Sequence, residues 1–135
     1  MDAYASLERA RELKIQIENL RRDYKYMMPA PGSPKMDGMP KGGQDDHGPD
    51  WIDKRDRLGK KIANLEAEHR RVMKTVDDVM EGMPHDLYRL CMYYFVSAYD
   101  NEDVYTFMEI SRRTFYNWKK EVYLWCKAYD EGTFS

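Results

Sequence analysis

The segment Asn101–Val122, NEDVYTFMEISRRTFYNWKKEV, carries residue types that suit contact with a nucleic acid. Four cations lie within the nine residues Arg112–Lys120, and no acid interrupts them before Glu121. Arginine can donate two hydrogen bonds to guanine, asparagine can pair with adenine, and lysine suits backbone phosphate. We expect one helix to present the following residues to DNA: Ser111, Arg112, Arg113, Thr114, Tyr116, Asn117, Lys119 and Lys120.

Apolar residues are spaced as a helix-turn-helix unit requires. Such a unit needs apolar side chains in its first helix, in its turn and on the inward side of its second helix. Counted from Asn101, the matching residues are Val104, Met108, Ile110, Phe115 and Trp118. Ser111 is a good first residue for the second helix, where free backbone amides also favour phosphate. The same spacing also fits an amphipathic helix whose polar side is merely solvated, so both interpretations stay open.

The rest of the chain divides at changes in composition. Five of the six prolines lie between residues 29 and 49, and prolines interrupt helices and central strands. After Pro84 we expect three helices, at about 85–98, 102–109 and 111–128. The fold class that follows is all-α, a long N-terminal helical hairpin or coiled coil followed by a three-helix helix-turn-helix bundle. The expected parts are 1–28, an N-terminal helix; 29–50, a Pro/Gly-rich loop; 51–83, a long heptad helix; and 84–135, the helix-turn-helix DNA-binding domain.

Both long helices carry apolar residues at alternating spacings of three and four, which is typical of a coiled coil. In the first helix these are Ala10, Leu13, Ile17, Leu20, Tyr24 and Met27. In the second helix they are Leu58, Ile62, Leu65, His69, Val72, Val76 and Val79. The second stripe must meet the first helix, a second copy of the chain, or both, and we expect a homodimer. His69 either fixes the register or makes the dimer sensitive to pH.

Composition limits the kinds of partner and chemistry. A net charge of -2 and a pI of about 5.9 exclude a global positive field, so binding to nucleic acid must be local. No apolar run approaches the roughly 18 residues that span a bilayer, and we expect a cytoplasmic protein that has no membrane partner. We interpret Cys91 and Cys126 as small buried hydrophobes. No catalytic pattern is visible, so we expect neither an enzyme nor a cofactor.

The Pro/Gly-rich segment offers weaker signals. Lys35 and Lys41 could belong to an arm that orders on DNA or on a partner, or to a simple connector. The spacing GxxxxGK[ST] of a nucleotide-binding loop is missing. Asp45, Asp46, His47 and Asp50 are metal-binding residue types, but no predicted helix or strand fixes the cluster, and we expect no metal site.

Two motifs resemble a known family, namely ISRRTFYNW at Ile110–Trp118 and SPKMDGMPKGG at 33–43. They are similar to segments of the small phage and prophage regulators of the ArpU/RinA type, whose C-terminal part looks like region 4 of bacterial sigma factors. The resemblance implies a DNA-binding transcription regulator of late or lytic phage genes, acting in a bacterial host cell. It also leaves RNA polymerase open as a second protein partner.

Two residues depart from the usual helix-turn-helix pattern. Tyr105 stands where the close crossing of the helices usually requires alanine, and we expect it to widen the angle between them. Glu109 stands in the turn, where glycine usually supplies a positive φ. A glutamate forced into that conformation costs on the order of 1 kcal/mol.

The function that these observations favour is a sequence-specific, DNA-binding transcriptional regulator of phage or prophage genes, whose helix starting at Ser111 enters the major groove. One alternative is a phage small-terminase-like subunit that recognises packaging DNA and assembles into a ring. Another is a partner-binding protein that mimics a sigma region without gripping DNA.

Overall fold

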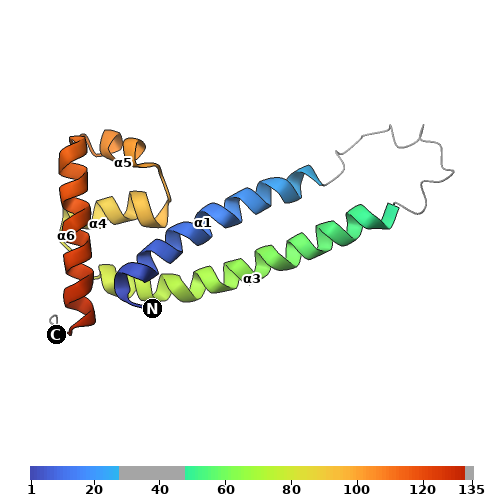
Figure 1. Cartoon of the computed structure of the whole chain (residues 1–135), viewed down its shortest axis with the longest axis horizontal. Coiled ribbons are helices and arrows are strands. Elements are labelled where there is room, and N and C mark those ends of the chain that lie inside the picture. The colour runs from blue at the N-terminus through green and yellow to red at the C-terminus, as the bar shows by residue number, and fades with distance from the viewer. Residues whose placement is uncertain (28–47, 133–135) are drawn as a thin grey trace. The chain divides into compact units, whose positions relative to one another are not determined.

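The computed structural model describes residues 1–27 and 48–132, and every regular element within them is helical. The predicted all-α fold class is therefore confirmed for this part of the chain. The elements in chain order are α1 (Ala3–Tyr26), α3 (Gly48–Met80), α4 (His85–Cys91), η2 (Met92–Val96), α5 (Asn101–Phe107) and α6 (Arg112–Asp130) (Figure 1). Helix α3 begins within the segment that we assigned to the loop. Residues 29–47 of that loop, with Lys35, Lys41, Asp45, Asp46 and His47, lie outside the described residues, whereas Asp50 lies in α3.

The helix predicted at about 85–98 is confirmed from His85 to Val96, but its second half is not α-helical. Pro84 occupies the position before α4, as the fixed φ of proline favours, but the α-helical geometry ends at Cys91. The following residues form a π-helix, in which the Ser97 amide donates to the Met92 carbonyl at 2.9 Å. Ala98 then adopts a φ of 62°. A π-turn and a left-handed alanine end the helix without the glycine that sequence rules look for.

Two compact units make up the chain, and the first comprises residues 1–15 and 67–135. Its hydrophobic core joins the first turns of α1 to the end of α3 and to the three-helix region. Trp125 Nε1 on α6 donates to the Val79 carbonyl on α3 at 2.7 Å, and the Ala3 amide donates to the Asp130 carboxylate at 3.1 Å. The largest fully buried side chains of this core include Phe95, Phe115, Leu7, Leu90, Val76, Val79, Val104 and Val122.

This core covers part of the predicted dimer seam. Val76 and Val79 are fully buried in a cluster that contains Ala3, Leu7 and Ala10 of the same chain. They are therefore covered without a second copy. Of the other predicted seam residues, one is buried and the rest are half-buried: Ile62, then Leu58, Leu65, His69 and Val72. The heptad pattern indicated a packed helix correctly, but it did not distinguish a partner within the chain from a second copy.

The second unit, residues 16–66, pairs the end of α1 with the first part of α3. Arg21 and Glu66 form an ion pair, and the Arg55 guanidinium lies 5.2 Å from the ring centre of Tyr24. The later residue of α1, Tyr24, contacts the earlier residue of α3, Arg55, so the two helices are antiparallel. None of the described helices of either unit is long and apolar enough to cross a membrane.

His69 lies in the first unit with one nitrogen unsatisfied. Its Nε2 atom is buried and has no hydrogen-bond partner among the described residues. Burial, and secondarily the charge of Lys14 on α1, lowers the pKa of His69 below its usual value. The folded state therefore favours the neutral ring, and the unfolded state binds the proton more readily.

We expect stability to fall on acidification from about pH 7.5 to about pH 5.5, a window around the ordinary histidine pKa. The contribution is complete above the unfolded-state pKa and is lost as the pH falls through the folded-state pKa. Urea unfolding at both pH values measures the change. His69→Leu should flatten it and add on the order of 1 kcal/mol of stability, because the orphan nitrogen is removed. An undiminished pH response in that variant would assign the effect to other groups.

Candidate nucleic-acid interface

A short turn closed by two backbone hydrogen bonds joins α5 (Asn101–Phe107) to α6 (Arg112–Asp130). The Glu109 amide donates to the Thr106 carbonyl at 3.1 Å, and the Ile110 amide donates to the Tyr105 carbonyl at 3.0 Å. Glu109 has a φ of 56°, which confirms the prediction that a non-glycine residue occupies the left-handed position of the turn. The Tyr105 ring is half-buried and packs edge-on against Phe115, with ring centres 5.8 Å apart.

We expect Glu109→Gly to raise the free energy of unfolding by on the order of 0.5–1 kcal/mol, because glycine adopts positive φ without strain. Urea denaturation of the purified variant measures this. Glu109→Asn, which tolerates the same conformation, should recover part of the gain, whereas Glu109→Ala should not. A loss of stability in the glycine variant would mean that the glutamate makes compensating contacts.

Helix α6 begins with a formed cap. Ser111 has the extended backbone of an N-cap residue, and its Oγ accepts a hydrogen bond from the Thr114 amide at 3.0 Å. Such a cap contributes about 1 kcal/mol. Beneath the helix, the five predicted apolar anchors face inward, and all are buried or half-buried: Val104, Met108 and Phe115, then Ile110 and Trp118. The inward side of the predicted helix-turn-helix is therefore packed as the spacing indicated.

The opposite side of α6 is open to solvent in the described part of the chain. Six of the eight predicted DNA-contact residues are exposed: Ser111, Arg112, Arg113, Tyr116, Asn117 and Lys120. Thr114 is half-buried and is held at the cap by a hydrogen bond between its hydroxyl group and that of Ser111, at 2.9 Å. We call the residues Arg112, Arg113, Tyr116, Asn117, Lys120 and Lys127 the basic face.

Lys127 belongs to this face, although sequence analysis missed it. Arg113, Lys120 and Lys127 recur every seven residues, which places them on one side of a helix, and all three are exposed. The signal was present in the sequence, but the expected contact residues ended at Lys120, before the acid Glu121. Glu121 is exposed, but it lies about 100° around the helix from Lys120 and therefore on another side.

Lys119 is less exposed than most of the other predicted contact residues. It is half-buried, and its Nζ lies 4.3 Å from the ring centre of Tyr94 in η2. The guanidinium of Arg11 on α1 lies 4.0 Å from the same ring, and its Nη1 donates to the Tyr94 carbonyl at 2.7 Å. Lys119 also lines a cavity of about 290 Å³ with Glu8. Arg112, seven residues before Lys119, lies on nearly the same side of the helix, so the contact with Tyr94, and not the helical position, distinguishes Lys119 from the exposed cations.

Residues at the start of α5 hold one side chain of the basic face in place and add negative charge near it. Asn101 Nδ2 donates to the Tyr116 hydroxyl at 3.1 Å, and the Arg112 guanidinium lies 5.7 Å from the Tyr116 ring centre. Tyr116 is therefore held before any ligand binds. The neighbouring residues Asp100, Glu102 and Asp103 are exposed acids that oppose phosphate near this end of α5.

The two cysteines are buried hydrophobes, as predicted. Cys91 and Cys126 are free and almost completely buried. Burial raises the pKa of Cys126 to about 12 and also raises the pKa of Cys91, so neither thiol is a ready nucleophile. Within residues 1–27 and 48–132, no three His, Cys, Asp or Glu side chains group as metal ligands.

Comparisons of the chain with protein-family models, curated proteins and solved structures found no match. The basic face, through its geometry and charge, is therefore the feature of the chain that points to a function.

Proposed function

We propose that the chain is a sequence-specific DNA-binding transcription regulator that inserts α6 into the major groove. The observation that carries this proposal is a capped helix whose basic face is solvent-exposed while buried anchors hold its other side. Arg112 and Arg113 at the start of α6 are suited to base edges, and Lys120 and Lys127 are suited to phosphates. A preformed helix also spares the cost of ordering this part of the backbone on binding.

The resemblance to ArpU/RinA-type regulators supports phage or prophage genes as targets and RNA polymerase as a second partner. A homodimer would let two copies of α6 contact paired half-sites. Because the chain itself covers Val76 and Val79, such a dimer would use a surface other than the C-terminal half of the heptad stripe.

The dependence of binding on salt tests the proposal directly. The basic face carries four cations, which would neutralise about four phosphates for one chain and about eight for a dimer. Between about 50 and 200 mM salt, affinity should fall by roughly 10² for one bound chain and roughly 10⁴ for two. Fluorescence anisotropy with duplexes selected from a host and phage genome measures this. Affinity independent of salt would exclude the phosphate contacts on which the proposal depends.

A second candidate is binding of a protein partner without DNA, as in a sigma-mimicking protein. The exposed acids Asp100, Glu102 and Asp103 beside the basic face favour it, because they repel phosphate. Replacing Glu102 with Gln and Asp103 with Asn should strengthen DNA binding if the regulator proposal holds.

A ring of about eight or more copies in light scattering would instead support the small-terminase-like alternative.

A further inference from the structure

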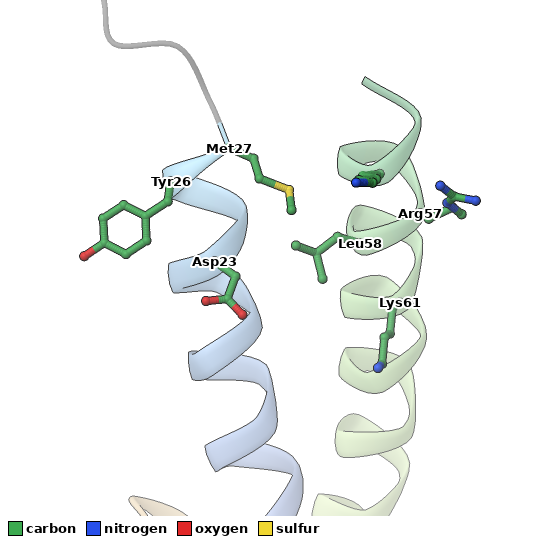
Figure 2. A pocket seen from close by; sticks show the side chains of 7 residues that line it. Asp23, Tyr26, Met27, Arg57, Leu58 and Lys61 are labelled. Atoms are coloured by element: carbon green, nitrogen blue, oxygen red, sulfur yellow. The ribbon is translucent and has the colours of Figure 1, made fainter. Parts of the chain in front are cut away.

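The second unit contains an open groove of about 600 Å³ between the end of α1 and the first part of α3 (Figure 2). Figure 2 shows Met27 and Leu58 extending toward each other between the two helices, whereas Tyr26 and Arg57 lie at the outer edges. Leu58 is half-buried, Met27 is 36% exposed and Tyr26 is 79% exposed. The floor of the groove is therefore apolar and open to solvent.

Positive charge lines one wall of this groove. Lys54, Arg57 and Lys61 follow one another at spacings of three and four, so they share a side of α3. All three are exposed, and none forms an ion pair with another described residue. Asp23 is the one acid among the lining residues. The wall thus carries three cations that form no ion pair with a described residue.

The second unit also has little core of its own. Among its residues whose burial is described, only Ile17 and Ile62 are buried hydrophobes. Leu20, Leu58 and Leu65 of the same stripes are half-buried. Two antiparallel helices can cover only part of each apolar stripe, and a third helix in the groove would cover more.

We propose that this groove binds an acidic, amphipathic α-helix of a partner protein. The apolar edge of that helix would pack on Met27 and Leu58, and its carboxylates would face Lys54, Arg57 and Lys61. A second copy of the same groove would bring three more cations, and like charges repel. A DNA backbone would contact the cations but would leave the apolar floor exposed, so DNA fits the groove less well than an amphipathic helix does. The proposal does not depend on DNA binding by α6.

A pair of model peptides tests the proposal on the full-length chain. The first is a labelled peptide of about six helical turns with leucine at heptad seam positions and glutamate on the flanks, and the second has lysine in place of glutamate. We expect fluorescence anisotropy to give a Kd of about 1–100 μM for the acidic peptide and at least about tenfold weaker binding for the basic one.

A charge-reversed variant should exchange this preference. Lys54→Glu, Arg57→Glu and Lys61→Glu together should weaken the acidic peptide by at least about tenfold and strengthen the basic peptide, which also shows that the variant is folded. The matched control is Arg70→Glu, Arg71→Glu and Lys74→Glu, which changes three exposed cations of α3 that do not line the groove. It should bind the acidic peptide as the unmodified chain does.

Three results would overturn the proposal. The first is equal binding of both peptides, or unchanged binding of the acidic peptide by the charge-reversed variant. The second is loss of binding to a duplex DNA in that variant when neither peptide binds, which would assign the groove to nucleic acid. The third is a dimer in sedimentation equilibrium that Leu58→Asp dissociates, which would assign the groove to a second copy of the chain.

Discussion

We expect Arg113→Ala combined with Lys120→Ala to weaken binding to the selected duplex by a factor of about 10² or more, since each lost contact to a base or phosphate costs about 1–3 kcal/mol. Both side chains are exposed on the basic face and lie seven residues apart, so one surface can engage both. Their removal should leave the fold intact, because neither contributes to the core. Anisotropy titrations at fixed salt, with helix content checked by circular dichroism, measure the loss.

A second double variant, which removes one lysine of α6 and one of α3, serves as the control. Lys119→Ala combined with Lys74→Ala removes the same total charge, but Lys119 packs on Tyr94 and Lys74 lies on α3. We expect this variant to keep DNA affinity within a few-fold, the level of screened long-range charge. If both double variants lose affinity equally, net charge rather than the basic face controls binding.

Phe115→Ala should lower the free energy of unfolding by about 3–5 kcal/mol, the usual cost of removing a buried phenyl ring. The ring is fully buried and packs edge-on against Tyr94 and Tyr105, with centres 5.9 and 5.8 Å away. It is the anchor that joins α6 to α5 and to η2. Urea denaturation followed by tryptophan fluorescence measures the change.

Phe107→Ala is the matched control, because the same ring is 49% exposed at the end of α5. It should cost about 1 kcal/mol or less, as surface changes usually do. If Phe115→Ala were as mild as this control, α6 would not depend on its anchor, and the rigid presentation of the basic face would lose its support.

The local features of the helix-turn-helix could be predicted from residue types and short spacings. The Ser111 cap, the inward position of Phe115 and the positive φ of Glu109 each follow from interactions within a few residues along the chain. Such interactions depend on helix geometry, which is the same in any fold. For this reason the predicted boundaries of α5 and α6 lie within two residues of those observed.

Contacts between distant segments decided the rest. Val76 and Val79 fit a heptad seam equally well against a second chain or against α1, and the hydrophobic effect does not distinguish the two because it has no direction. Lys119 is half-buried because it packs against Tyr94, which is 25 positions earlier in the sequence.

By itself the sequence determined the helical class, the cap, the turn and the side of α6 that faces inward, since short periodicities encode them. Only the tertiary structure decided which cations remain outside, which heptad positions are covered within one chain, and where the groove beside Leu58 opens. The physical reason is that exposure is a property of the assembled neighbours and not of a residue and its spacing.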